Sequence, residues 1–139
     1  MDWTLELVMI PTVDVDRAKA FYLDQVGFDL IVDHSAGDDF RVVQLVPRGS
    51  ACAIAIMKNT EMAPGSQHGL HLCVSDIDAA RAQLVAHGVD ASELYHFTAG
   101  GQQPGPDPER QSYNTFLSFK DPDGNTWLVQ EVKRDQAHA

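Results

Sequence analysis

The feature that most constrains the fold of this chain is an internal repeat. The segment Asp14–Ala20 (DVDRAKA) matches Asp76–Ala82 (DIDAARA) at an offset of 62 residues. An apolar, strand-like run precedes each segment, and a glycine follows where a helix would stop, Gly27 in the first copy and Gly88 in the second. A pattern used twice predicts two similar supersecondary units rather than one irregular fold.

A second pair of matching segments extends the repeat. The turns at 47–50 (PRGS) and 122–125 (PDGN) each lead into an apolar run, 51–57 in the first copy and 126–132 in the second. The offset is now 75 residues, so the second copy has gained residues. The gain falls in 98–112, which is rich in Gly, Pro and Gln and is predicted to be a long loop, either a binding lid or an idle insertion.

Each copy predicts the order strand, helix, strand, strand, strand. The predicted strands are 3–10, 28–34, 39–46 and 51–57 in copy one and 69–74, 92–97, 113–120 and 125–133 in copy two, with helices from Asp14 to about Val26 and over 77–87. The fold class is therefore α+β: two βαβββ modules whose curved mixed sheets surround a cavity. We expect a single domain over 1–134, with copy one at 3–57, copy two at 69–133 and a frayed tail at 135–139.

Composition excludes several classes of function. The chain has 10 Lys and Arg against 20 Asp and Glu, a formal net charge of −10, and its basic residues are scattered singly. Nucleic acids and anionic membrane surfaces are therefore not expected as partners. No run approaches the roughly 18 apolar residues of a membrane span, and the N-terminus shows no secretory signal. Cys52 and Cys73 are expected to be reduced thiols in a cytoplasmic protein.

The repeat and two of its motifs resemble the vicinal-oxygen-chelate superfamily. The stretch 13–22 (VDVDRAKAFY) and the turn 121–125 (DPDGN) carry the resemblance, which covers about Trp3 to Glu131. This superfamily includes glyoxalase I, bleomycin-resistance proteins and extradiol dioxygenases. The same scaffold hosts metal enzymes and metal-free binding proteins, so the fold alone does not give the function.

The resemblance implies where metal ligands would lie. The enzymes take a His or Glu from the first and last strand of each copy, seven residues before the aspartate that opens the helix and four residues past the turn glycine. These positions are Leu7 and Ala53 in copy one and Gly69 and Leu128 in copy two. None has a side chain that donates an electron pair to a metal, so no metal cofactor is expected.

A divalent metal remains the alternative if this alignment is displaced. Glu6, His68 and Glu131 lie near three of the four positions. Each is offset by an odd number of residues, however, which turns its side chain to the opposite face of the sheet.

Strand alternation predicts a mostly apolar concave face. Its predicted residues are Leu5, Leu7, Met9, Ala53, Ala55, Gly69, His71, Cys73, Thr126, Leu128 and Gln130. His71 is a candidate hydrogen-bond donor or general base, with a core histidine as the alternative. Trp127 and Val129 have the opposite parity and are predicted to be core. His34, His87 and His96 are interpreted as solvated or turn-side residues.

We expect this chain to hold an organic ligand in an apolar cavity without a metal. The predicted ligand contacts are Leu7, Met9, His71, Arg110, Tyr113, Leu128 and Gln130, with His71 as the candidate catalytic residue. The acidic balance favours a cationic ligand, and the resemblance implies a homodimer. The alternatives are a metal-dependent enzyme, such as a glyoxalase-like lyase, isomerase or dioxygenase, and a metal-free enzyme with His71 as base.

Overall fold

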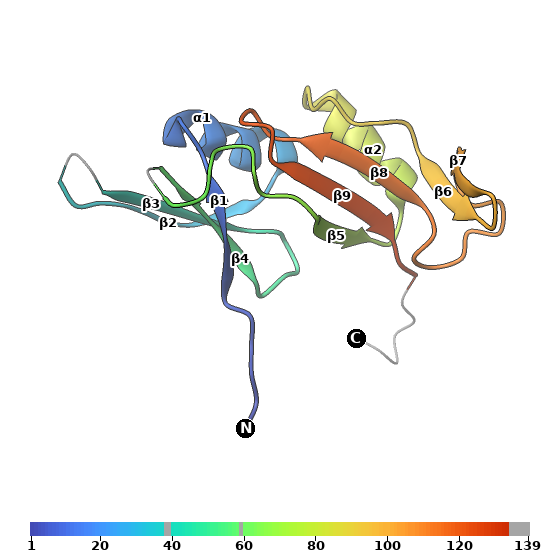
Figure 1. Ribbon diagram of the computed structural model, residues 1–139, viewed down its shortest axis with the longest axis horizontal. Helices are drawn as coiled ribbons and strands as arrows, with labels where there is room; N and C mark the ends of the chain where they lie inside the picture. Colours follow the sequence, from blue (N-terminus) through green and yellow to red (C-terminus); the bar gives the residue numbers. More distant parts are fainter. Residues whose placement is uncertain (38–39, 59, 134–139) are drawn as a thin grey trace. The chain divides into compact units, whose positions relative to one another are not determined.

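The computed structural model describes residues 1–37, 40–58 and 60–133 (Figure 1). The chain forms two compact units that follow the sequence repeat closely. Unit 1 comprises Met1–His68 and the turn Asp121–Asn125, and unit 2 comprises Gly69–Lys120 and the chain from Thr126 onward. The predicted tail at 135–139 lies outside the described residues. None of the helices in the described part of the chain has the length and apolar character to cross a bilayer.

Unit 1 is a four-stranded sheet with one helical segment, in the predicted order. Its strands are β1 (Leu7–Pro11), β2 (Asp29–Ser35), β3 (Arg41–Val46) and β4 (Ala53–Met57), arranged as β1-β4-β3-β2. The β1–β4 pair is parallel and the other pairs are antiparallel. The first strand begins later than predicted, because residues 1–6 are exposed and lie outside the strand.

The helical segment of unit 1 begins and ends where its sequence predicts. The Asp14 carboxylate accepts a hydrogen bond from the Arg17 backbone N–H (3.1 Å) and caps α1 (Val15–Ala20). The chain continues as a π-helical turn, η1 (Phe21–Val26), and stops at Gly27, which has a left-handed φ of 89°. The apolar stripe, Ala18 and Tyr22 among others, is buried against the sheet.

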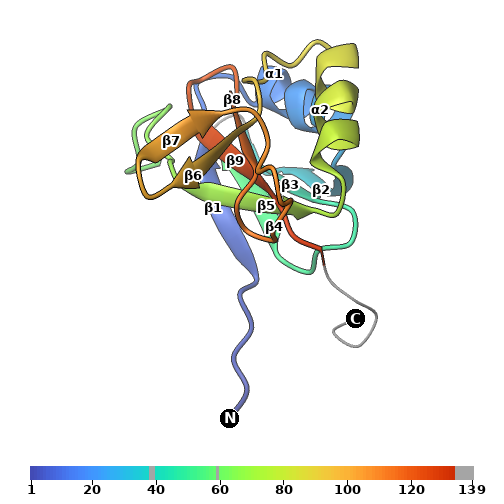
Figure 2. The ribbon, with the colours of Figure 1, turned by 90° about the vertical axis from the view of Figure 1, so that its right-hand side faces the viewer.

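Unit 2 repeats this plan with an additional strand. Its elements are β5 (Leu70–Val74), α2 (Ile77–Ala86), β6 (Tyr95–Thr98), β7 (Gly101–Pro104), β8 (Phe116–Lys120) and β9 (Thr126–Glu131), and its sheet order is β5-β9-β8-β6-β7. Asp76 caps α2 as Asp14 caps α1, through a 3.1 Å bond from the Ala79 N–H. Figure 2 shows the β6–β7 hairpin.

The hairpin corrects the prediction that 98–112 is one long loop. Residues 101–104 form β7, in which Gln102 pairs with Phe97 and Pro104 with Tyr95. Its sequence, GQQP, contains the residues Gly and Pro, which are uncommon in strands. The extended conformation is stabilised by pairing with β6. Pro104 lies on an edge strand, where the missing N–H costs no ladder bond. Only the remaining part of the insertion is loop.

Strand alternation assigns the core of unit 2 correctly, with one exception. Trp127 and Val129 are 4% and 2% exposed, as predicted, and Trp127 stacks on Phe119 with ring centroids 6.1 Å apart. His96, however, was expected in solvent and is buried, with its Nδ1 2.7 Å from the Gly105 carbonyl oxygen. The hairpin supplies that partner, so a buried imidazole is satisfied.

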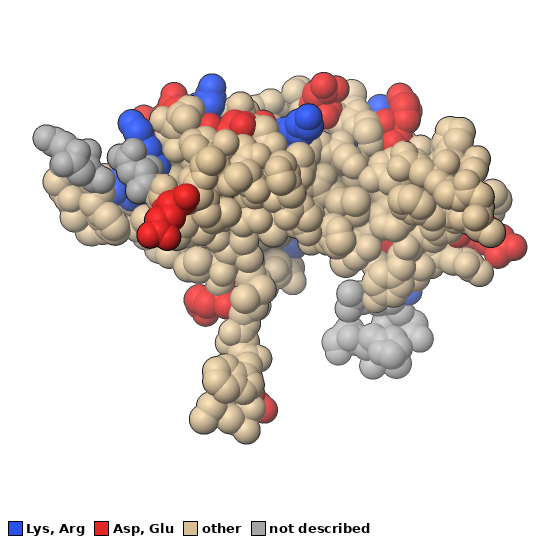
Figure 3. Space-filling view, viewed as in Figure 1, with Lys and Arg blue, Asp and Glu red and all other residues tan. Residues whose placement is uncertain are grey.

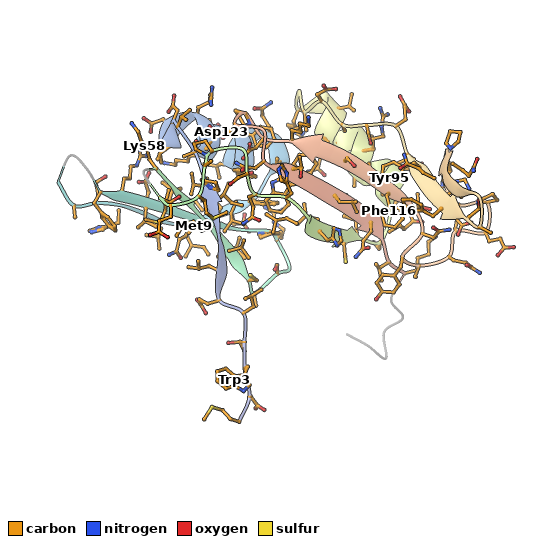
Figure 4. The ribbon with its side chains drawn as sticks, viewed as in Figure 1. Trp3, Met9, Lys58, Tyr95, Phe116 and Asp123 are labelled. Carbon is orange, nitrogen blue, oxygen red and sulfur yellow. The ribbon has the colours of Figure 1, made fainter. Side chains whose placement is uncertain are left out.

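The turn between β8 and β9 belongs to unit 1 and is held there by side chains of the first copy. The Tyr22 hydroxyl donates to the buried Asp121 carboxylate (2.7 Å), and the Asn125 amide donates to the Pro11 carbonyl (3.0 Å). The Thr12 hydroxyl donates to Asp123 (2.5 Å). Figure 4 shows Asp123 at this turn. The motif DPDGN therefore has a structural role.

Removing the Tyr22 hydroxyl tests that role. Tyr22→Phe leaves the buried Asp121 carboxylate without one of its donors, and we expect the free energy of unfolding to fall by about 1–3 kcal/mol. Urea denaturation measures this value. Tyr113→Phe is the matched control, because Tyr113 is 58% exposed and should change stability by less than about 0.5 kcal/mol. Equal effects of the two substitutions would contradict the assigned role.

A second polar network joins α1 to the β2–β3 edge. Asp33 on β2 accepts hydrogen bonds from Arg41 (2.9 and 3.0 Å) and from the Lys19 ammonium (2.7 Å). The Arg41 guanidinium, with a smaller effect from the Lys19 ammonium, holds the pKa of Asp33 well below its usual range. Folding therefore favours the ionised carboxylate.

This network predicts a pH-dependent stability. A carboxyl group with a lowered folded-state pKa stabilises the fold above its unfolded pKa of about 4 and loses that contribution as the pH falls toward the folded value. Asp33→Asn should cost about 1 kcal/mol or less at pH 7, and the difference from wild type should shrink below about pH 4. Asp29→Asn, at the exposed Arg48–Asp29 pair, should have no measurable effect at either pH. A difference between wild type and Asp33→Asn that grows on acidification would refute the assignment.

Candidate functional site

Each unit leaves one face of its sheet uncovered by a helix, and these open faces carry most of the predicted site. In unit 1, Leu7 and Met9 of β1 lie opposite Ala53 and Ala55 of β4. On its other side, Ala55 lies opposite Gln44 of β3. Residues directly opposite in a sheet point to the same side. This open face is therefore apolar, with the Gln44 amide among aliphatic side chains. Figure 4 shows Met9 on β1.

The open face of unit 2 carries more hydrogen-bonding groups. His71 lies opposite Leu128, and Cys73 lies opposite Gln130. Leu128 and Gln130 face Ser118 and Phe116 of β8 on their other side. The Gln130 amide donates to the Cys73 sulfur at 3.2 Å. The four predicted contacts on β1 and β9 and His71 of β5 therefore all lie on open faces of their own units.

The strand register changes one detail of the comparison between the two copies. Counting residues along the sequence makes Gly69 the equivalent of Leu7 in the second copy, but Gly69 precedes β5. In the sheets, Leu7 lies opposite Ala53, and the residue opposite Leu128 is His71. Local counting fails here because register is set by pairing across the sheet. His71 is exposed, so its ring is available to a ligand on this face.

The same face carries an aromatic cluster that the sequence pattern did not predict. Its members are Tyr95, Phe97 and Phe116, and we call it the aromatic wall. Tyr95 stacks on Phe116 with ring centroids 5.7 Å apart, and Phe97 meets Phe116 edge to face at 5.5 Å. Tyr95 lies opposite Phe116, which lies opposite Gln130 (Figure 4). The alternation of Tyr95 and Phe97 around His96 was the available signal, but it does not reveal which strand is next to β6.

The two predicted contacts from the insertion lie elsewhere in unit 2. Arg110 forms ion pairs with Asp78 (2.8 Å) and with Glu131 (3.5 Å), and Asp78 raises the pKa of its guanidinium. Tyr113 is exposed, and its backbone N–H donates to the Glu131 carbonyl (2.8 Å). Both residues have a positive φ, 51° and 70°. The charge of Arg110 is therefore neutralised within unit 2.

The loop around these residues is ordered by Asp107. Its carboxylate accepts hydrogen bonds from the backbone N–H groups of Glu109 (3.1 Å) and Gln111 (3.0 Å). These bonds lower the pKa of Asp107, and the bond from Glu109 has the larger effect. This part of the insertion is built like a capped turn, and its two bonds flank Arg110, one of the two residues with a positive φ.

The residues at the family's metal-ligand positions do not fit a metal ion. Leu7, Ala53 and Leu128 have aliphatic side chains. At the fourth position the residue count gives Gly69, which has no side chain, whereas the strand register gives His71. These positions therefore supply at most one nitrogen donor, which is fewer than a divalent site needs. Glu131 points to the helix-covered face, where its carboxylate accepts from the Ile77 N–H (3.1 Å). Within residues 1–37, 40–58 and 60–133, the one close group of three potential ligands is Asp76, Asp78 and Glu131, against which Arg110 lies.

Comparisons with known proteins agree with this architecture. The family model of the Glyoxalase/Bleomycin resistance protein/Dioxygenase superfamily matches residues 4–129. The protein YetH of Bacillus subtilis is 26% identical over 125 residues, which cover 89% of this chain and 94% of YetH.

Solved structures extend the comparison. TnmS3, an antibiotic binding protein from Streptomyces sp. CB03234, is 30% identical, with a TM-score of 0.74 and coverage of 94% of this chain and 97% of TnmS3. A superfamily member from Sphaerobacter thermophilus is 25% identical, with a TM-score of 0.70 and coverage of 94% and 98%. The chain therefore belongs to the glyoxalase/bleomycin resistance protein/dioxygenase superfamily.

Proposed function

We propose that this protein binds a small organic molecule on its open sheet faces, without a metal ion. The observation that carries the proposal is the replacement of metal donors by Leu7, Ala53 and Leu128 on faces that remain uncovered by helices. Such a surface gains free energy by burying an apolar ligand. A few polar groups, Gln130 and His71 among them, would orient the ligand.

The similarity to TnmS3 supports the class of function. That protein is an antibiotic binding protein, and the similarity extends over 94% of the present chain. A ligand with a cationic group is favoured by the net charge of −10, although net charge acts over long range and selects weakly. The face of the molecule seen in Figure 3 shows Lys and Arg side chains dispersed among Asp and Glu rather than gathered in a patch.

We further propose that the protein is a homodimer in the cytoplasm. An open apolar sheet face requires a cover in water, and a second copy of the chain supplies one. Trp3 and Leu5, 86% and 70% exposed on the N-terminal segment seen in Figure 4, would also be covered by association. Cys52 and Cys73 are free thiols, as suits a reducing compartment.

A second candidate function is metal-free catalysis with His71 as general base. The observation that favours it is the exposed position of this imidazole on the open face of unit 2, opposite Leu128. Binding and catalysis share the site, so binding is the property to test first.

The binding proposal is tested with a panel of apolar drug-like compounds and antibiotics, by thermal shift with and without EDTA. We expect at least one compound to raise Tm saturably and equally in both conditions. Gln130→Ala should weaken that compound's affinity about three- to tenfold, the effect of losing one or two hydrogen bonds. Gln83→Ala, on the exposed side of α2, is the matched control.

Two kinds of result would contradict the proposed function. Stoichiometric metal in protein purified without chelators, or a large Tm shift with Ni²⁺, Zn²⁺, Mn²⁺ or Fe²⁺, would refute the metal-free site. No saturable shift across the whole panel would refute small-molecule binding.

A further inference from the structure

The aromatic wall of unit 2 is built as a rigid surface although part of it faces solvent. Phe97 is 46% exposed, and Tyr95 and Phe116 are half-buried. Each ring contacts the other two, with Tyr95 and Phe97 meeting edge to face at a centroid distance of 6.1 Å. Aromatic pairs of this kind contribute to the stability of the fold, and the part of their surface that faces solvent is also open to contact with a ligand.

Side-chain hydrogen bonds hold the Tyr95 ring and the backbone of Phe97. The pairing of β6 with β8 is given by a single residue pair, Tyr95 with Phe116. At Phe97, hydrogen bonds from the Asn114 side chain replace those of a paired strand. The Asn114 Oδ1 accepts from the Phe97 N–H, and its Nδ2 donates to the Phe97 carbonyl, both at 3.0 Å. The Tyr95 hydroxyl lies 2.8 Å from the Ser118 hydroxyl. The wall is therefore positioned before any ligand arrives.

The wall borders a hollow of suitable size. A hollow of about 610 Å³ lies at the Tyr95 end of the wall: Tyr95 lines it, and Phe97 and Phe116 do not. Its other lining residues include Ser118 of β8, Glu93, and Gln102 and Pro104 of β7. This volume falls within the range of small-molecule sites. On the other side of Phe116 lies Gln130, whose amide keeps a donor and an acceptor beyond its bond to Cys73. Flat apolar surface, space and a polar group thus lie on one face.

We infer that the ligand of the proposed function carries a flat, fused aromatic ring system, which stacks against Tyr95, Phe97 and Phe116. A planar ring gains from both dispersion and the quadrupoles of the wall, whereas an aliphatic ligand of the same size gains only burial. Because Ser118 holds the Tyr95 hydroxyl and Asn114 holds the Phe97 backbone before binding, little conformational entropy is lost on binding. The inference rests on the proposed function and narrows its ligand class.

The experiment compares three probes by isothermal titration calorimetry. Proflavine is flat and cationic, anthraquinone-2-sulfonate is flat and anionic, and amantadine is a cationic aliphatic cage. We expect one or both flat probes to bind at least tenfold more tightly than amantadine. The order of the two flat probes reports the preferred charge.

Two variants locate the binding. Phe97→Leu should weaken the flat probes about three- to tenfold, the usual effect of losing one aromatic contact. Phe40→Leu is the matched control, since Phe40 lies in unit 1 and is 47% exposed. Asn114→Ala keeps every ring of the wall and should weaken the flat probes without affecting amantadine. An unchanged Tm and circular dichroism spectrum of Phe97→Leu would exclude misfolding as the cause.

The failures of the two proposals are distinguishable. If compounds of the panel bind but the flat probes do not exceed amantadine, or if Phe97→Leu binds the flat probes as wild type does, the aromatic ligand class is refuted and small-molecule binding stands. If neither the panel nor any probe binds, both proposals are refuted.

Discussion

Asp121 is a buried carboxylate, and the turn in which it lies depends on satisfying its charge. The Tyr22 hydroxyl, the Asn125 amide and the backbone N–H groups of Asp123 and Asn125 all donate to it. A buried carboxylate with fewer donors would be strongly destabilising. The residues of the turn and of η1 must therefore be placed together, which couples the end of the sequence to the packing of unit 1. The compact turn also brings the Asp123 carbonyl so near Gly65 that a side chain there would collide with it.

In the described part of the chain, the helix of each unit packs on one face of its own sheet. Each sheet has one side occupied by its own helix and core, represented by Ile56 in unit 1 and Val129 in unit 2. The helix-covered side thus supplies much of the stability, while on the other side Leu7, Met9, Leu128 and Gln130 stay partly exposed and the small Ala53 and Ala55 are buried among their neighbours. Replacing donors by leucine and alanine at the family's metal positions changes the chemistry of those faces without disturbing the helix-covered core, which explains how one scaffold serves unlike functions.

The second copy shows how a departure from the repeat creates a new surface. Its insertion forms β7 and an ordered loop, with Asp107 capping one turn and Arg110 paired to Asp78. Asn114, two residues after the insertion, bonds the backbone of Phe97 in the aromatic wall. Residues added inside one copy of a module, between two of its strands, are not constrained by the module's core. They can therefore adapt the open face to a ligand.

The sequence by itself determined the modules and, for strands such as β9, which side faces the core. The repeat, the capping aspartates Asp14 and Asp76, and the alternation that buries Trp127 are local patterns, and local patterns are readable along the chain. The same reasoning placed Leu7, Met9 and Gln130 on open faces. It also identified the family through the turn of Asp121.

Tertiary structure alone decided which side chains meet. His71 rather than Gly69 lies opposite Leu128, His96 is buried against Gly105, and Arg110 is paired within unit 2. The aromatic wall likewise exists only because β6 lies beside β8. Alternation along a strand gives the side on which a residue lies, but neighbours across a sheet depend on register between segments distant in sequence. That register is set by the free energy of the whole packed unit.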